Sequence, residues 1–325
     1  MPRPVARRYP VITAPPRCVE HPTMKRTLQA TARSLGLVTL LYLSSLAARA
    51  AEPFFFIQLS DPQFGMFTGN KGFEQETANF EFAVATVNRL RPAFVIITGD
   101  LVNKPGDNTQ IAEYKRIVGK IDSKIPVYDV VGNHDIENVP TPATIAAYTN
   151  LFGPDRYTFR HGKFTGIVLN SMLLHSPQQT TNEAAAQEYW LRDELARAKA
   201  DGAQHLVVFQ HHPWFIKSAN ETNQYFNIPL APRLAYLALF RQYGVKHVFC
   251  GHYHRNAVAR DGDLEAVTTG PVGQPMGGDL SGLRVVIVRE DKIEHRYYHF
   301  GEIPNRINLT PPKPARAKAA STPSP

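Results

Sequence analysis

The chain has 325 residues, 43% of them hydrophobic, and a net charge of +8, which fits a soluble globular protein of one large or two small domains. The positive charge would suit a nucleic-acid ligand, but residues 51–303 hold 24 Lys and Arg against 27 Asp and Glu, a balance of −3. The basic excess therefore lies at the two ends, and no nucleic-acid partner is expected.

The N-terminal residues have the pattern of an export signal. Lys25 and Arg26 precede an apolar stretch at 35–46, and residues 48–50 form an A-x-A cleavage site. The apolar stretch is shorter than the roughly 20 residues of a membrane-spanning helix. Cleavage is therefore favoured over the alternative, an uncleaved anchor.

These features divide the chain into four parts. They are an over-long gene start at 1–23 ahead of Met24, a signal peptide at 24–50, a folded domain at 51–303 and a disordered Pro/Ala/Lys tail at 304–325. The mature protein is expected to be periplasmic or secreted, with no membrane contact. Loss of Cys18 with the leader would leave Cys250 alone, so no intrachain disulfide is expected. Cys250 ends an apolar strand and is interpreted as a small buried residue.

Apolar strands alternate with amphipathic helices through the domain, which predicts βαβ units and an α/β fold. Five strands that run into polar residues are expected at 54–59, 93–97, 126–131, 206–209 and 245–250. Helices are expected at 74–90, 109–120, 183–199 and 229–243. A hairpin is expected at 157–169, with its turn at His161 and Gly162. Three short strands are expected at 264–268, 283–288 and 293–300. Residues 136–150 are expected to form an irregular surface segment.

Each of the five strands ends in residues of the kind that bind metals. These residues are Asp61 and Gln63, Asp100, Asn133 with His134 and Asp135, His211, and His252 with His254. Any one of these ends could be an ordinary turn. Five together are hard to explain as turns, and the carboxyl ends of strands are where α/β sheets carry their sites.

The motifs DPQ, GDLV, GNHD, QHHP and GHYH, at 61–63, 99–102, 132–135, 210–213 and 251–254, resemble in that order those of the calcineurin-like metallophosphoesterases. Stretches such as FQHHPWF and GHYHRNA resemble one subgroup, the calcineurin-like phosphoesterase domain-containing protein 1 group, regarded as protein serine/threonine phosphatases. The resemblance covers roughly 53–299. It implies a four-layer αββα sandwich with a dinuclear metal site at the carboxyl ends of the strands.

The resemblance also implies two sets of metal ligands that share Asp100. The first set is Asp61, Gln63, Asp100 and His254, and the second is Asp100, Asn133, His211 and His252. Mixed nitrogen and oxygen ligands suit Mn, Fe or Zn better than Ca, and the amide oxygen of Gln63 adds Mg as a harder candidate. The family usually has His where Gln63 stands, but the subgroup also has Gln, so Gln63 is not interpreted as a loss of activity. His212 is the alternative to His211.

The resemblance gives His134, backed by Asp135, the catalytic role of stabilising the transition state or protonating the leaving oxygen. Five further residues are candidates for contact with the substrate: Trp214, Tyr225, Asn227, Arg255 and Asn256. The glycine-rich loop 270–282 is a candidate for closing over the site.

The predicted reaction is metal-dependent hydrolysis of a phosphomonoester, in a small molecule or at phosphoserine or phosphothreonine of a protein. Two alternatives remain. One is a phosphodiesterase acting on cyclic nucleotides or other diesters, because the same dinuclear site serves both reactions. The other is a metal-loaded binding protein without turnover. No oligomeric state is predicted.

Overall fold

Two β-sheets pack face to face in the computed structural model, which describes residues 52–310. The first sheet, in the order β11-β10-β1-β2-β3, contains β1 (Phe54–Leu59), β2 (Val95–Thr98), β3 (Val127–Val130), β10 (Gly282–Val288) and β11 (Ile293–His299). The second sheet, in the order β4-β5-β6-β7-β9-β8, contains β4 (Tyr157–His161), β5 (Phe164–Val168), β6 (His205–Phe209), β7 (His247–Cys250), β8 (Ala257–Asp261) and β9 (Leu264–Thr268). The predicted leader and signal peptide lie outside the described residues.

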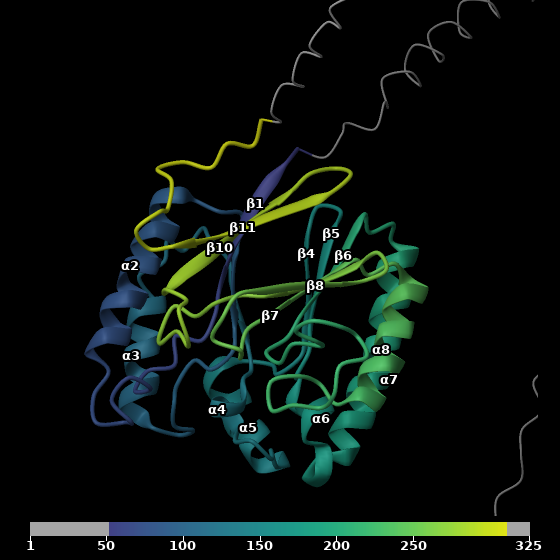
Figure 1. Ribbon diagram of the computed structural model, residues 1–325, viewed down its shortest axis with the longest axis horizontal. Coiled ribbons are helices and arrows are strands. Elements are labelled where there is room, and N and C mark those ends of the chain that lie inside the picture. The colour runs from purple at the N-terminus through teal and green to yellow at the C-terminus, as the bar shows by residue number, and fades with distance from the viewer. Residues whose placement is uncertain (1–51, 311–325) are drawn as a thin grey trace, which may run out of the picture. The chain divides into compact units, whose positions relative to one another are not determined.

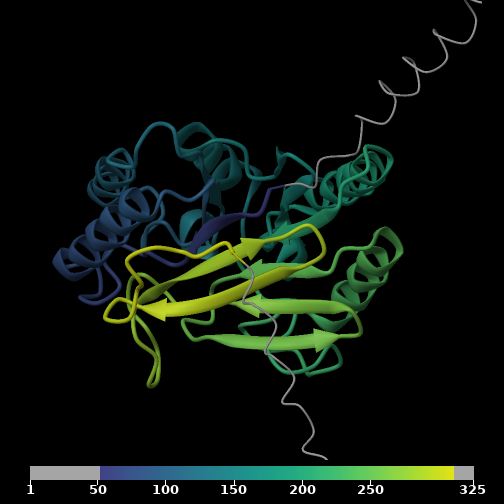
Figure 2. The ribbon, with the colours of Figure 1, turned by 90° about the horizontal axis from the view of Figure 1, so that it is seen from above.

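The pairing of the strands brings the five polar strand ends to one edge of the domain. Strands β1, β2 and β3 are parallel to one another, and β10 joins them antiparallel. Strands β5, β6, β7 and β9 are also parallel, with β4 and β8 antiparallel at the edges. Figure 2 shows the yellow strands β10 and β11 of the first sheet alongside green strands of the second.

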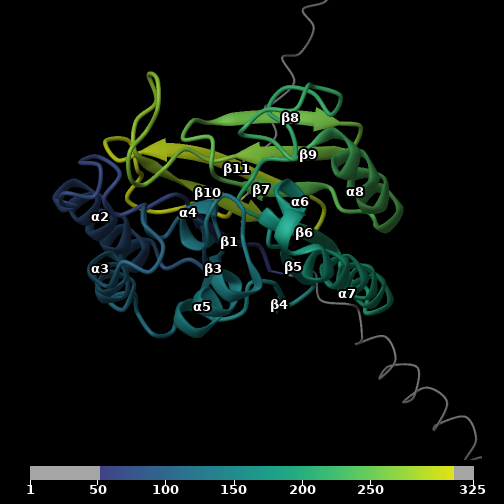
Figure 3. The same ribbon diagram turned by 90° about the horizontal axis from the view of Figure 1, so that it is seen from below.

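Helices cover the outer face of each sheet. Helices α2 (Glu74–Leu90) and α3 (Asn108–Val118) flank the first sheet, and α7 (Thr181–Ala200) and α8 (Leu230–Tyr243) flank the second (Figure 1). The remaining helices are α4 (Asn133–Ile136), α5 (Pro142–Phe152), α6 (Met172–His175) and the 3-10 turn η1 (Pro177–Gln179). Figure 3 looks at the end of the domain where α4, α5 and α6 lie between these flanking helices. The predicted four-layer αββα sandwich is confirmed.

Aromatic packing joins the two sheets. The ring of Phe56 in β1 lies 4.6 Å from that of Phe94 and 5.8 Å from those of Phe209 and Phe249, measured between centroids. Because these strands are buried on both faces, their sequences are continuously apolar rather than alternating. This rigid layer holds the strand ends in place.

Local sequence explains most of the element boundaries. The side chain of Asp107 caps α3 by accepting hydrogen bonds from the backbone N–H groups of Thr109 and Gln110, at 3.0 and 3.2 Å. Helix α2 ends at Leu90 because Arg91 takes a left-handed conformation and Pro92 follows.

Two expectations from the sequence were wrong, and one strand was missed. Helix α5 occupies part of the segment predicted to be irregular, because Thr141 caps it and Pro142 stands at its first turn, where proline is tolerated. Strand β8 was not predicted. Residues 304–310 belong to the fold, since Ile307 and Leu309 pack against the first core and the Leu309 carbonyl accepts from Arg289 Nη1 at 2.6 Å. Residues 311–325 lie outside the described part. Cys250 is buried, as predicted.

Within residues 52–310, no helix combines the length and apolar character needed to cross a membrane.

The half-buried carboxyl group of Asp129 in β3 makes stability depend on pH. Burial raises its pKa to about 6, although the Tyr114 hydroxyl donates a hydrogen bond to it at 2.5 Å. Because the folded-state pKa lies above the unfolded-state value, stability is lost as pH rises from 4 through 6. We expect Asp129→Asn to raise the free energy of unfolding at pH 7.5 by at most about 3 kcal/mol, at 1.36 kcal/mol for each pKa unit. At pH 4 the gain should vanish in chemical unfolding, and an equal gain at both pH values would contradict this account.

Candidate metal centre

Five of the predicted ligands leave their strands in a left-handed backbone conformation. Their φ angles are +47° for Asp61, +40° for Gln63, +50° for Asp100, +67° for His252 and +53° for His254. Such angles are uncommon for residues other than glycine and persist where the surroundings enforce them, often at functional sites. Positive φ angles therefore recur after three separate strands, β1, β2 and β7, each beside the site.

One group of ligand-type side chains consists of Asp61, Asp100 and His254, whose ligand atoms all lie within 4.8 Å of one another. All three side chains are buried. The Asp61 carboxylate lies 3.5 Å from His254 Nε2 and accepts hydrogen bonds from the backbone N–H of His252 at 3.1 and 3.2 Å. The structure thus brings together three members of the predicted first set.

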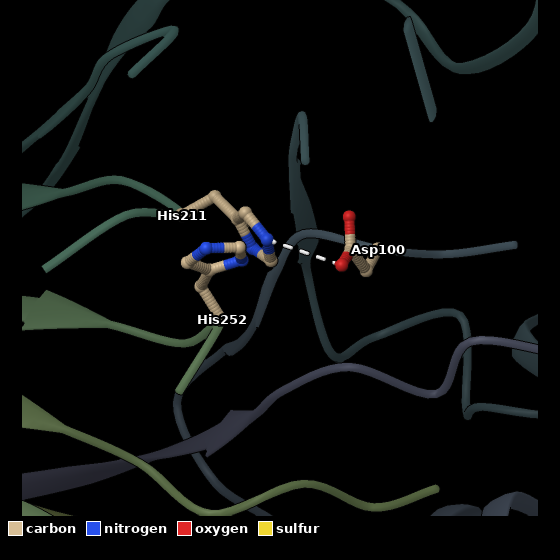
Figure 4. Close-up of side chains that lie close together, drawn as sticks. All are labelled: Asp100, His211 and His252. Atoms are coloured by element: carbon tan, nitrogen blue, oxygen red, sulfur yellow. Dashed lines mark ion pairs between the residues drawn. The ribbon is translucent and has the colours of Figure 1, made fainter. Parts of the chain in front are cut away.

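A second group consists of Asp100, His211 and His252, again with their ligand atoms within 4.8 Å of one another. Figure 4 shows His211 between His252 and Asp100, with His211 Nε2 3.2 Å from Asp100 Oδ2. The amide oxygen of Asn133 lies 3.0 Å from the same ring nitrogen. All four members of the predicted second set are therefore neighbours, and Asp100 belongs to both groups.

Backbone carbonyls fix the orientation of these imidazoles. His211 Nδ1 lies 2.8 Å from the Thr98 carbonyl, His252 Nε2 3.2 Å from that of Tyr225, and His254 Nδ1 2.5 Å from that of Gln274. A carbonyl can only accept, so each of these nitrogens carries the proton when the ring is neutral. The other nitrogen of each ring keeps its lone pair, as a metal ligand requires.

The side-chain oxygen of Gln63 indicates that the site is suited to a metal ion. Its Nε2 donates to Asn103 Oδ1 at 3.1 Å, but its Oε1 is buried without a hydrogen-bond partner. A buried amide oxygen left unpaired is costly, and a bound cation is a partner that would satisfy it. The donor set of carboxylate, amide and imidazole atoms fits a divalent metal ion.

Two buried carboxylates give the site its electrostatic character. Burial raises the pKa of Asp61 despite its neighbours His254 and His211. Burial alone would lower the pKa of His211, but Asp100 raises it to about 9. Both raised pKa values indicate that the buried carboxylates are stabilised by positive charge beside them, supplied by a proton or by a metal ion.

His134 lies at the site, but Asp135 does not support it as predicted. His134 Nδ1 lies 2.8 Å from the Asn103 carbonyl, and the His134 backbone N–H donates to Asp100 at 2.9 Å. Asp135 instead accepts from the backbone N–H groups of Leu101, Val102 and Gly132, at 2.8, 3.2 and 2.8 Å. The prediction that Asp135 orients the imidazole was therefore wrong. Asp135 ties the turn after β2 to the turn after β3.

Three of the residues predicted to contact the substrate serve the fold instead. Trp214 is fully buried behind the second sheet, against Tyr236 and Phe240. Asn227 is buried and bonds within its own loop, donating to Glu221 at 2.7 Å.

The third of these residues is Asn256, whose side-chain oxygen accepts from Gly270 N at 3.2 Å and Arg284 Nη2 at 2.8 Å. The loop 270–282, which follows β9, is tied to the site, with Gly273 N donating to the Asp61 carbonyl at 3.0 Å. That hydrogen bond argues against the predicted closing motion.

The other two candidates for substrate contact stay exposed. Tyr225 is 51% exposed, and its hydroxyl accepts from Asn133 Nδ2 at 3.3 Å. Arg255 is exposed and lies over the Tyr253 ring at 5.5 Å.

His212, the alternative ligand, lies in neither metal-binding group. Its Nδ1 pairs with the Ser171 hydroxyl at 3.0 Å. The residue that sequence reasoning missed is Asn103, which contacts both Gln63 and His134. Its only signal was its place directly after GDLV.

Gly132 is needed because Asp100 packs against it. A Cβ at Gly132 would overlap the backbone nitrogen and Oδ1 of Asp100. We expect Gly132→Ala to displace Asp100, to cost about 1–3 kcal/mol in unfolding free energy, and to weaken metal binding. Gly278→Ala is the matched control, since a Cβ there meets no atom within 4 Å. Metal titration and thermal unfolding measure both effects, and equal results for the two variants would refute this role.

Two buried ligand groups sharing one carboxylate, at the ends of parallel strands in an αββα sandwich, define the metallophosphoesterase class of hydrolases. The chain matches the family model described as calcineurin-like phosphoesterase over residues 56–256. It therefore belongs to the calcineurin-like phosphoesterase family and is a hydrolase of phosphate esters.

Similar proteins agree with this assignment. The serine/threonine-protein phosphatase CPPED1 of Bos taurus is 39% identical over 266 residues, covering 77% of this chain and 85% of that protein. The Homo sapiens protein of the same name is 38% identical over 267 residues, with 77% and 85% covered. A purple acid phosphatase from yellow lupin seeds shares the fold, with a TM-score of 0.59 at 14% identity, covering 77% of this chain and 52% of that one.

Proposed function

We propose that this chain is a dinuclear phosphatase that hydrolyses phosphomonoesters, with phosphoserine and phosphothreonine in proteins as its substrate class. The observation that carries the dinuclear site is the pair of ligand groups joined by Asp100. The substrate class rests on similarity to proteins named serine/threonine-protein phosphatase at 38–39% identity.

Each proposed ion has its own ligands besides Asp100. Asp61, Gln63 and His254 would hold the first ion, and Asn133, His211 and His252 would hold the second. When bound, the ions act as Lewis acids toward the phosphate and lower the pKa of a water molecule. Mn, Fe, Zn and Mg all suit this donor set, and we propose Mn or Fe.

His134 is the proposed proton donor to the leaving oxygen. Because its Nδ1 faces the Asn103 carbonyl, Nε2 is the nitrogen that remains for the substrate. A positioned imidazole of this kind contributes roughly 10²–10⁴-fold to a rate.

Substrate comparison tests this proposal. Full-length protein loaded with Mn should hydrolyse a phosphoserine peptide and p-nitrophenyl phosphate faster than bis(p-nitrophenyl) phosphate. Preference for the bis-ester would indicate a phosphodiesterase. If the protein hydrolyses p-nitrophenyl phosphate but not the phosphoserine peptide, its function is restricted to small phosphomonoesters.

We also propose that residues 24–50 export the protein to the periplasm or beyond the cell. The charged start, the apolar stretch at 35–46 and the A-x-A site support this. N-terminal sequencing of the native protein should find Ala51 first. A native protein beginning at Met24 or earlier would refute cleavage.

A further inference from the structure

Gln63 poses a problem of orientation that a histidine would not. An amide presents an oxygen on one side and an NH₂ group on the other, and only the oxygen binds a metal ion. A rotation of about 180° about the last side-chain bond would turn the NH₂ group toward the site. Something in the structure must select the productive orientation.

Two backbone N–H groups fix the orientation of the Gln110 amide, the first in a series of hydrogen-bonded amides that ends at Gln63. Those of Asn103 and Lys104 both donate to Gln110 Oε1, at 3.0 and 2.9 Å. Backbone N–H groups only donate, so the oxygen of Gln110 must face them. Its Nε2 then donates to Asn70 Oδ1 at 2.9 Å.

The amide of Asn70 in turn orients that of Asn103, and the amide of Asn103 orients that of Gln63. Asn70 Oδ1 also accepts from Asn103 Nδ2 at 2.8 Å, so the oxygen of Asn103 faces the other way. There it accepts from Gln63 Nε2 at 3.1 Å. This leaves Gln63 Oε1 as the buried atom without a partner.

The backbone holds the last two of these amide side chains, those of Asn103 and Gln63, in register. Phe64 and Val102 form a parallel bridge between the loops that follow β1 and β2. Gln63 N donates to the Asp100 carbonyl at 2.9 Å, and Asn103 N lies 3.2 Å from the Phe64 carbonyl. Gln63 and Asn103 are thereby held side by side.

We propose that the amide chain Gln110–Asn70–Asn103–Gln63 sets the orientation of Gln63 and so presents its oxygen to the first metal ion, with Asn103 as the positioning residue. The proposal rests on the proposed ligand role of Gln63. Residues outside the first coordination sphere of a metal commonly change its affinity by roughly 10- to 100-fold.

The test measures Mn²⁺ bound to the full-length protein by equilibrium dialysis, independently of activity. Asn103→Leu removes the acceptor at similar size, and we expect one of two ions to bind roughly 10- to 100-fold more weakly. Asn103→Asp still accepts from Gln63 Nε2 and should retain both ions. Loss of affinity in Asn103→Asp equal to that in Asn103→Leu would overturn the proposal.

A second pair of variants acts further from the metal. Asn70 is exposed and has a φ of +68°, which glycine adopts readily, so Asn70→Gly should fold. It removes the acceptor that orients Asn103, and we expect weaker binding of the same ion. Asn70→Asp keeps that acceptor and should bind as wild type does. Unchanged binding by Asn70→Gly would show that the chain does not extend past Asn103.

A double-mutant cycle separates this inference from the ligand assignment. Either ring nitrogen of a histidine at position 63 can bind a metal, so Asn103→Leu should cost less in a Gln63→His background than in wild type. Gln63→Ala should lose the first ion. If Gln63→Ala binds both ions as wild type does, the ligand role fails; if it loses one while Asn103→Leu does not, only the orienting role fails.

Discussion

Asp100→Asn is expected to lower kcat for phosphomonoester hydrolysis by at least about 10³-fold. Asp100 is the one carboxylate common to both ligand groups, and it lies 3.2 Å from His211 Nε2. Loss of its charge should weaken the binding of both ions, and metal ions supply several kcal/mol to such reactions, each 1.36 kcal/mol being tenfold in rate. Steady-state kinetics and a count of bound metal check the result.

Asp129→Asn is the matched control for this substitution. It also removes a carboxylate from the first sheet, in β3, but Asp129 pairs with Tyr114 and belongs to neither ligand group. We expect its kcat and metal content to equal those of wild type. An Asp100→Asn enzyme that keeps two ions and full activity would remove Asp100 from the site.

The second large effect is expected for His134→Ala. If His134 protonates the leaving oxygen, kcat should fall about 10²–10⁴-fold for an alkyl phosphate or phosphoserine peptide. The fall should be much smaller for p-nitrophenyl phosphate, because nitrophenolate leaves without a proton. Parallel kinetics on the two substrates measure the difference.

Metal content distinguishes a catalytic role of His134 from a structural one. His134→Ala should keep both ions, and His161→Ala, at the exposed turn between β4 and β5, should behave as wild type. An equal loss on both substrates would mean that His134 acts on charge or on metal binding and not as a proton donor.

The placement of the site could be predicted because strand ends carry it. Continuous apolar runs predicted β1 and β2, and the first polar residues after them had to meet at one edge of the sheet. Helix α5 was missed for a physical reason. Pro140 and Pro142 were the reason for expecting an irregular segment at 136–150, whereas Pro142 stands at a first turn, where its missing N–H costs nothing.

Side-chain direction could not be predicted. Asp135 is adjacent to His134 in sequence, but in a one-turn helix its carboxylate points back to Gly132 N, at 2.8 Å. Asn256 follows the ligands directly and instead bonds Arg284 at 2.8 Å. The contact between Gln63 and Asn103 depends on the bridge between two loops 40 residues apart, which no local pattern encodes.

The central claim is that two metal ions on one shared carboxylate make this chain a phosphatase. The most direct test strips the full-length protein of metal and titrates it with Mn, Mg, Fe or Zn. Bound ions and p-nitrophenyl phosphate turnover are followed together. The account predicts no turnover without metal and full turnover as the second ion binds. Full activity in the stripped protein, or no activity on monoesters with two ions bound, would contradict it.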